Sequence, residues 1–209
     1  MRITKFGHAC VRLERDGQVL VVDPGAFTEP EAVDGAGAVL VTHEHPDHLD
    51  VDRLRRVEVP VYAGDGVAQA LRDQAPDVAE RLQVVRDGDE VSAAGMRVTV
   101  HGEEHALIHD DIPRIVNTGF CVEDHVFHPG DSFTAPPRPM PMLLVPVHAP
   151  WMRLAEAVDF ARKHTGGAAV AVHDGLLNDN GLAVTDRMMG GLLEARDVEF
   201  RHVAPGDDV

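Results

Sequence analysis

Histidine and aspartate are concentrated in one short segment of the chain, the heptapeptide THEHPDH at residues 42–48. It follows the apolar run AVLV, which we predict to be a buried strand. Residues two apart in an extended chain face the same way, so His43 and His45 can reach one cation. The proline then turns the chain and directs Asp47 and His48 to a second position nearby. Imidazole nitrogens with a few carboxylates are typical of zinc, manganese or iron sites.

The composition agrees with metal binding and argues against polyanionic partners. The chain has 13 histidines and 35 acidic residues against 19 Lys and Arg residues, which gives a formal net charge of −16. Proteins that bind nucleic acid or anionic membranes need a basic face, and this chain lacks the charge for one. We therefore expect a small-molecule substrate, with no nucleic-acid or membrane partner; the sequence does not give the oligomeric state.

Two cysteines, Cys10 and Cys121, lie in apolar runs and are expected to be buried thiols rather than a disulfide framework. The N-terminal segment is too short and too polar for a secretory signal. No stretch approaches the roughly 18 apolar residues of a membrane span. These features lead us to expect a cytoplasmic protein.

Hydrophobic periodicity predicts one α/β domain over residues 1–209, in which clustered strands precede strands that alternate with helices. Asp16-Gly17 between two apolar runs indicates a hairpin, and four prolines within 134–142 predict a loop. Thr185 is a plausible N-cap of the last helix. The predicted helices are 48–56, 65–74, 151–164 and 185–196, and the predicted strands are 1–6, 9–14, 19–22, 38–41, 82–85, 90–93, 96–101, 117–123, 126–127, 143–147, 168–172 and 199–203.

A weak internal similarity links two segments, because VVDPG at 21–25 resembles FHPGD at 127–131. In both cases a later apolar strand ends in histidine, at His43 and at His148. Two similar halves would produce this pattern, and so would chance, since many strand-to-turn junctions have this composition.

The HxHxDH pattern after a hydrophobic strand resembles the signature of the metallo-β-lactamase fold. The resemblance covers nearly the whole chain and is similar in motif order to the UlaG-like branch, which includes an ascorbate-6-phosphate lactonase. It implies a four-layer αββα sandwich with two mixed sheets and outer helices. The further motifs that carry it are Gly7-His8-Ala9, Asp23-Pro24, Asn117-Thr118-Gly119-Phe120, His128-Pro129-Gly130-Asp131 and Val172-His173.

The resemblance also implies seven ligands for two divalent ions, with zinc or manganese expected. The third histidine of the first site should follow the strand 96–101, where His105 fits better than His101 or His109. By the resemblance, Asp131 bridges both ions. The remaining ligands carried over are His43 and His45 for the first ion, and Asp47, His48 and His173 for the second.

Several other residues have two open interpretations. Asp23 and His8 resemble residues that orient ligand imidazoles, and a plain structural role is the alternative. His128 either supports the site or ends a strand, and Trp151 is expected to pack at a loop-to-helix junction. By the resemblance, His148 lies at the edge of the metal cleft. There it either protonates a leaving group or hydrogen-bonds the substrate, or it only caps its strand and packs on Trp151.

Two sequence features depart from patterns seen in related branches. Flavo-diiron proteins usually have a carboxylate at the position of His45, which argues against a redox diiron site. UlaG-like relatives usually have a small residue at the position of His148, so the substrate does not follow from the resemblance.

Two cations that share a water or hydroxide lower its pKa toward neutrality, which supplies a nucleophile without serine or cysteine. Asp131 would bridge the metals and Asp47 would help to position the hydroxide. We predict a binuclear metal-dependent hydrolase that cleaves an ester, lactone, amide or phosphoester, for which Arg114, Arg138 or Arg153 could hold one phosphate. The alternatives are a single-iron oxygenase of the same fold, resembling a sulfur dioxygenase, and a metal-binding protein without turnover.

Overall fold

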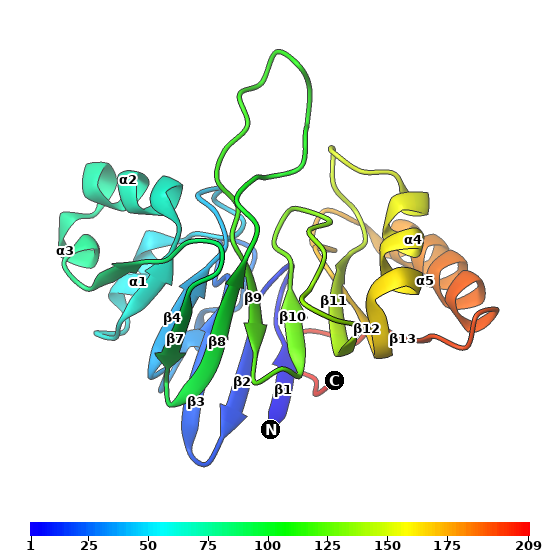
Figure 1. The fold of residues 1–209 in the computed structure, drawn as a ribbon, viewed down its shortest axis with the longest axis horizontal. Coiled ribbons are helices and arrows are strands. Elements are labelled where there is room, and N and C mark those ends of the chain that lie inside the picture. Colours follow the sequence, from blue (N-terminus) through cyan, green and yellow to red (C-terminus); the bar gives the residue numbers. More distant parts are fainter.

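Two β-sheets pack face to face in the computed structural model, which describes residues 1–209, and helices cover the outer face of each sheet (Figure 1). This is the four-layer αββα arrangement with two mixed sheets that the sequence predicts. The sheets are formed by consecutive halves of the chain, with β1 to β6 in one sheet and β7 to β13 in the other.

The first sheet has its strands in sequence order. Its first three strands pair antiparallel and the later strands pair parallel. The predicted hairpin is present, with Asp16 and Gly17 at φ 52° and 77° between β2 and β3. The strands are β1 (Arg2–Lys5), β2 (Val11–Arg15), β3 (Gln18–Val22), β4 (Ala38–Val41), β5 (Val61–Ala63) and β6 (Leu82–Val84).

The second sheet repeats this order of pairing, since β7 to β10 pair antiparallel and β10 to β13 pair parallel. In this order β3 and β10 occupy equivalent places in the two sheets, and so do β4 and β11. This agreement in strand pairing favours two similar halves, rather than chance, as the origin of the repeated sequence pattern. The strands are β7 (Glu90–Ala93), β8 (Met96–His101), β9 (Gly119–Val122), β10 (Val126–His128), β11 (Met140–Pro146), β12 (Thr165–Val172) and β13 (Glu199–Arg201).

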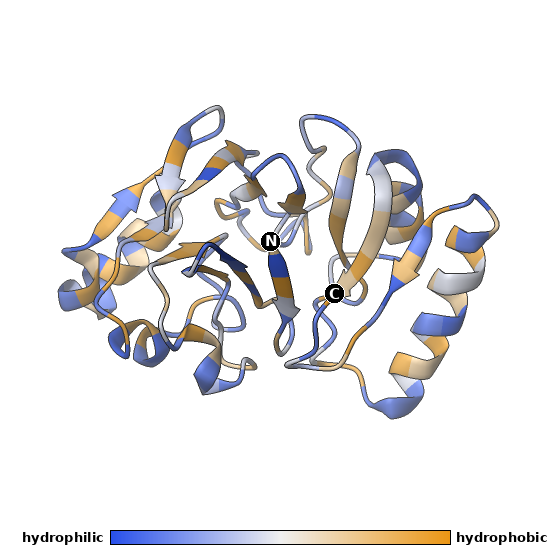
Figure 2. Cartoon of the chain, turned by 90° about the horizontal axis from the view of Figure 1, so that it is seen from below, coloured by the Kyte–Doolittle hydropathy of each residue, from blue (hydrophilic) through white to orange (hydrophobic).

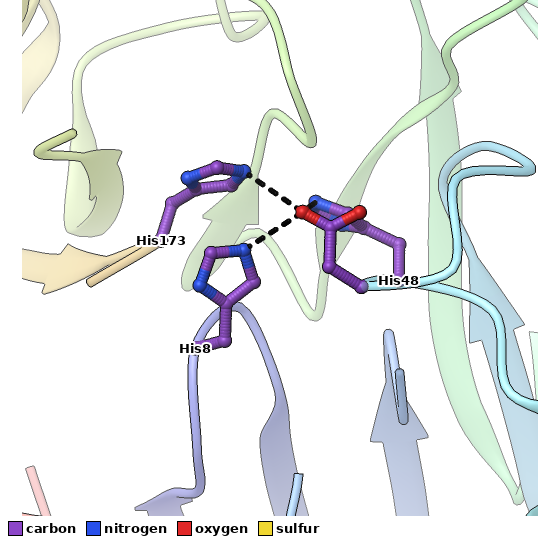
Figure 3. Close-up of side chains that lie close together, drawn as sticks. His8, His48 and His173 are labelled. Atoms are coloured by element: carbon purple, nitrogen blue, oxygen red, sulfur yellow. Dashed lines mark hydrogen bonds and ion pairs between the residues drawn. The ribbon is translucent and has the colours of Figure 1, made fainter. Parts of the chain in front are cut away.

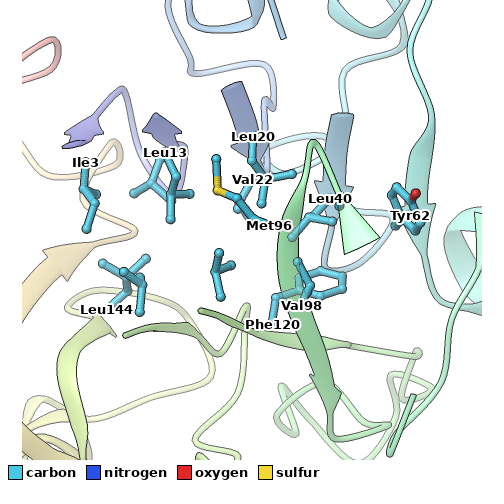
Figure 4. Packing of buried hydrophobic residues seen from close by; sticks show 14 of the residues in the cluster. Ile3, Leu13, Leu20, Val22, Leu40, Tyr62, Met96, Val98, Phe120 and Leu144 are labelled. Atoms are coloured by element: carbon cyan, nitrogen blue, oxygen red, sulfur yellow. The ribbon is translucent and has the colours of Figure 1, made fainter. Parts of the chain in front are cut away.

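Three apolar layers hold the four structural layers together. Alternation along β3 explains how a continuous apolar run serves two of them: Leu20 and Val22 face the second sheet, whereas Val21 faces the helices. Figure 4 shows the layer between the sheets, where Leu20 of the first sheet and Phe120 of the second lie in the same cluster. Each central strand therefore needs apolar residues on both of its faces, which explains its continuous apolar run.

Helices α1 to α3 flank the first sheet and α4 and α5 flank the second (Figure 1). No helix is long and apolar enough to cross a lipid bilayer. The helices are the 3₁₀ turn η1 (Pro30–Val33), α1 (Val51–Arg55), α2 (Asp65–Gln74), α3 (Pro76–Ala79), α4 (Leu154–His164) and α5 (Asp179–Glu194).

Several element boundaries differ from the sequence prediction: α1 and α4 each begin three residues later than predicted, β12 begins three residues earlier, and β5 was not predicted. Two further differences have a clear physical cause. Helix α5 begins at Asp179, and Asn178 caps it by accepting a hydrogen bond from the Gly181 backbone, so Thr185 lies buried inside the helix and is not its N-cap. Strand β11 begins within the proline-rich segment predicted to be a loop. Its register shifts between Met140 and Met142, which accommodates the missing N–H of Pro141.

The two chain ends meet at the lower side of the sandwich, as Figure 2 shows from below. Thr4 of β1 forms an isolated antiparallel bridge with Asp208, and the Asp208 carboxylate accepts hydrogen bonds from Arg2 and Thr4. The C-terminal residues thus extend the pairing of the first strand.

Gly25 provides a test of how tightly the loop after β3 packs on the histidine-rich segment. A methyl group at Gly25 would overlap the Asp47 carbonyl, so Gly25→Ala should lower the free energy of unfolding by about 2–3 kcal/mol. At Gly191 in α5 a methyl group would meet nothing within 4 Å. Gly191→Ala is the matched control and should stabilise by about 0.5–1 kcal/mol. Denaturant unfolding measures both, and equal stability of the two variants would contradict this packing.

Candidate metal centre

Two clusters of potential ligands lie where strand ends of both sheets meet. One contains His43, His45, His105 and Asp131, and the other contains His8, Asp47, His48 and His173; within each, the ligand atoms lie within 4.8 Å of one another. Each of these residues lies in the loop that follows a strand, at the edge where α/β proteins commonly bind ligands. The structure therefore brings together all seven residues that the sequence proposed as ligands, and adds His8.

In the first cluster, three imidazole rings converge around one position. His43 Nε2 lies 3.0 Å from His45 Nδ1, and the His105 ring is within 5.0 Å of both rings, measured between centroids. His43 and His105 are buried and His45 is half-buried. His101 and His109 stay outside: the His101 ring contacts Thr99, and His109 is exposed.

In the second cluster, His8, His48 and His173 approach from three separate loops (Figure 3). Asp47 Oδ2 lies 3.1 Å from His8 Nε2, 3.6 Å from His173 Nε2 and 3.9 Å from His48 Nε2. The Asp47 carboxylate thus faces all three rings.

Asp131 lies between the two clusters. Its Oδ1 is 3.1 Å from His48 Nε2, while Oδ2 is 3.2 Å from His173 Nε2, 3.4 Å from His105 Nε2 and 4.0 Å from His43 Nε2. One carboxylate consequently contacts histidines of both clusters, as a group shared by two cations must.

The ring orientation of three histidines is fixed by an acceptor behind each ring. His48 Nδ1 donates to Asp23, His105 Nδ1 to the carbonyl of Ala106, and His173 Nδ1 to the carbonyl of His148. Each neutral ring then has its lone pair on Nε2, which points into the centre. His43 follows the same rule, because its Nδ1 lies 3.0 Å from the Thr42 hydroxyl oxygen, and that hydroxyl donates to Asp23.

His8 has the opposite orientation. Its Nδ1 accepts a hydrogen bond from the Gly175 backbone N–H at 3.0 Å, so the proton of the neutral ring is on Nε2. Nε2–H then donates to Asp47. In this arrangement His8 holds a carboxylate and offers no lone pair to a cation, which is the supporting role that its sequence motif suggested.

Asp23 and Asn117 form the layer behind the ligands. Asp23 is fully buried and accepts hydrogen bonds from the Thr42 backbone, the Thr42 hydroxyl and His48, which exceeds a simple turn cap. The Asn117 side chain accepts from the Asp131 backbone N–H and donates to Pro129. The sequence proposed Asp23 for such a role, but it gave no role to Thr42 or Asn117 individually.

The backbone is in the left-handed region at three of these positions: φ is 62° at His8, 51° at Asp23 and 60° at His173. Non-glycine residues adopt this conformation at an energetic cost, and such residues cluster at functional sites. Gly130 also has positive φ, and a side chain there would overlap Asn117 and Thr42. Tight turns after the strands therefore set the direction of the ligand side chains.

Burial and mutual charge set the protonation of the cluster. Burial lowers the pKa of His43 well below 6.5, and also lowers that of His45. Burial alone would lower the pKa of His48 too, but the charges of Asp131 and Asp23 raise it well above 6.5. Burial opposes ionisation of Asp131, yet His48 and the neighbouring histidines hold its pKa well below the usual range.

The Asp47 carboxyl is also held ionised. Burial alone would raise its pKa, but the hydrogen bond from His8 and the nearby His48 lower it to about 2. Both carboxylates of the centre are thus charged at neutral pH, ready to bind a cation.

The donor atoms fit divalent ions. The Nε2 atoms of His48, His105 and His173 and Oδ1 of Asp131 are buried without a hydrogen-bond partner of good geometry. Such atoms are costly to bury unless something binds them. Neutral imidazoles and carboxylates suit zinc, manganese and iron, and the two carboxylates supply negative charge toward a cation.

The remaining candidates lie at the margin of the centre. His128 Nε2 donates to the carbonyl of Ala9, and its Nδ1 accepts from the Gly130 backbone N–H. These contacts agree with the interpretation that His128 ends its strand. The His148 imidazole is exposed and makes no hydrogen bond, although its carbonyl orients His173. Trp151 packs against Phe133, and its indole also donates to Asp131, a contact that the sequence prediction missed.

Cavities flank both clusters. One of about 620 Å³ is lined by His8, Phe27, Asp174 and Leu177, among others. Another, of about 670 Å³, is lined by residues that include His105 and Phe133. Both are in the size range of small-molecule sites.

Comparison with known proteins identifies the family. Residues 2–173 match the model of the β-lactamase superfamily domain. The protein Rv0786c of Mycobacterium tuberculosis is 34% identical over 96% of this chain and 95% of its own length. A UPF0173 metal-dependent hydrolase of Methanocaldococcus jannaschii, MJ1163, is 28% identical over 62% of this chain and 60% of its own length.

A solved structure shows the same fold. The metallo-β-lactamase fold protein YhfI of Bacillus subtilis superposes with a TM-score of 0.73 at 14% identity, covering 100% of this chain and 98% of that one. Together with the family match, this establishes that the chain belongs to the β-lactamase superfamily and has the metallo-β-lactamase fold.

Proposed function

We propose that this metal-dependent hydrolase uses two divalent ions, zinc or manganese, to hydrolyse an ester, lactone, amide or phosphoester bond in a small molecule. The proposal rests on one observation: buried Nε2 atoms of histidines, oriented by hydrogen bonds, converge from both sides on the single carboxylate of Asp131. The relatives described as metal-dependent hydrolases support the same reaction class.

In this proposal His43, His45 and His105 would hold the first ion and Asp47, His48 and His173 the second, and Asp131 would be shared between them. When bound, the ions polarise the scissile bond and lower the pKa of water toward neutrality. Asp47, which accepts a hydrogen bond from His8, would help to position the water that attacks the substrate. Asp131 keeps the two halves of the centre at a fixed separation.

His148 is the proposed general acid. Its backbone carbonyl accepts a hydrogen bond from His173, which places the residue beside the centre, and its imidazole is exposed. An imidazole there can protonate a leaving group.

The arginines proposed from the sequence to hold a phosphate do not favour a phosphorylated substrate. Arg114 pairs with Glu104, Arg138 with Asp124 and Arg153 with Glu156. Because each guanidinium already has a carboxylate partner, an anionic substrate would have to displace it. We therefore rank carboxylic esters, lactones and amides above phosphoesters as substrates.

We further propose that the protein belongs to the UlaG-like branch. We also propose that it is cytoplasmic and has no nucleic-acid or membrane partner.

A panel of such substrates, tested on metal-loaded protein, examines the proposal directly. Turnover of an ester or lactone that disappears with chelator and returns with Zn²⁺ or Mn²⁺ supports it. Oxygen consumption with a thiol substrate and bound iron would instead favour the oxygenase alternative.

Ligand variants test the assignment of the centre. The reconstituted protein should contain two ions per chain, and His105→Ala should lose the first ion because it removes one of three nitrogens. His101→Ala and His109→Ala are matched controls that should retain two ions. Elemental analysis measures all four, and a wild-type maximum of one ion would contradict the binuclear centre.

The two ions should respond differently to pH. A metal must displace a proton from His48, whose pKa is raised, so affinity for the second ion should rise about tenfold per pH unit near neutrality. His43 and His45 have lowered pKa values and are already neutral there, so affinity for the first ion should change little. Zinc titrations between about pH 6 and 8 measure both slopes. Equal slopes would contradict the assigned protonation.

Loss of the His148 imidazole should affect turnover and leave metal content unchanged. His148→Ala keeps the carbonyl that orients His173, so both ions should remain, while kcat/KM falls by about 10²-fold if the side chain protonates the leaving group. Steady-state kinetics with elemental analysis measures this. An unchanged kcat/KM would return His148 to a structural role.

A further inference from the structure

The only tryptophan of the chain contacts the central carboxylate. Trp151 lies in the turn between β11 and α4, and its indole Nε1–H donates to Asp131 Oδ2 at 2.9 Å. Its ring lies edge-on to Phe133, with centroids 5.2 Å apart, and 6.1 Å from the His105 ring. Trp151 is half-buried, whereas the carboxylate it contacts is buried.

The hydrogen bond from Trp151 differs in kind from the other side-chain contacts of the Asp131 carboxylate. Every other side-chain group within ion-pair distance of the carboxylate, up to 4.0 Å, is a histidine: His43, His48, His105 or His173. Those rings direct Nε2 lone pairs into the centre once their Nδ1 protons are used elsewhere, so they cannot donate to Asp131 when they bind ions. The indole is then the one side-chain donor left to orient this carboxylate.

The chemistry of indole suits this position. It is a donor without a lone pair to offer, so it neither competes for an ion nor takes a proton from the centre. It is uncharged, unlike Lys or Arg, and adds no repulsion toward a dication. The indole also packs against Phe133, which in turn packs against Phe160 with centroids 5.2 Å apart, so the apolar part of the ring has apolar neighbours.

We propose that Trp151 is a positioning residue, whose indole N–H fixes the orientation of the Asp131 carboxylate for binding both ions. The inference rests on the proposed function, because it takes Asp131 as a metal ligand. Partners that orient metal ligands typically contribute 10–100-fold to metal affinity or activity. Removing the N–H alone should therefore weaken zinc binding by about tenfold or more.

The single tryptophan permits a one-atom test. Growth of a tryptophan auxotroph on β-(3-benzothienyl)alanine replaces only Trp151 and exchanges the N–H for sulfur, while ring size and packing are nearly preserved. Trp151→Phe removes the same donor genetically. Phe133→Leu is the matched control, because it alters packing on the indole and leaves the N–H in place.

Competition with a chromophoric chelator measures zinc affinity on metal-free protein, and circular dichroism checks the fold. We expect both donor-free proteins to bind zinc at least about tenfold more weakly than wild type, and Phe133→Leu to stay within a few-fold. Tryptophan emission of the wild type should also change saturably with added zinc. If the benzothienyl protein is folded and binds zinc like wild type, the inference is wrong, even when wild type binds two ions. If wild type binds no zinc at all, the proposed function itself fails.

Discussion

The centre depends on one constraint: the Asp131 carboxylate is buried and charged at the junction of two sheets. A buried carboxylate is costly unless positive charge or hydrogen-bond donors surround it. Histidines from both halves of the chain and one indole supply these contacts. The turns after the strands, the strained φ angles and the buried Asp23 all serve to aim these groups at one point.

The same constraint explains the unequal properties of the histidines. His48 lies between two carboxylates and has a raised pKa, whereas His43 is buried mainly among other imidazoles and has a lowered one. Sequence neighbours thus differ strongly in basicity because of what the fold places around them. His8 differs again, since a backbone N–H behind its ring reverses the direction of its proton.

The sequence predicted the fold class and the enzyme class because these depend on dense local signals. Apolar runs mark strands buried on both faces, and the HxHxDH segment carries its ligands within six residues. The predicted start of α5 was wrong, because Asn178 and not Thr185 caps the helix, by accepting a hydrogen bond from the Gly181 backbone N–H. The choice of His105 over His101 and His109 as a ligand depended on the family resemblance and not on local spacing alone.

Contacts between residues that lie far apart in the chain could not be predicted from the sequence. Nothing near Trp151 in the chain indicates that its indole reaches a carboxylate twenty residues earlier. Likewise, the direction of the His8 proton depends on Gly175, at the other end of the chain. Such pairings follow from how the two sheets dock, and no local pattern of residues records that docking.

The division of the chain into two consecutive sheets has a consequence for the unfolded state. Each cluster draws residues from both halves, so an ion held by His48 and His173 joins positions that enclose more than half of the chain. In topological terms such an ion is a reversible cross-link. It closes a long loop and removes conformational entropy from any state in which the sheets have separated. The metal centre would then also hold the two halves of the polypeptide together.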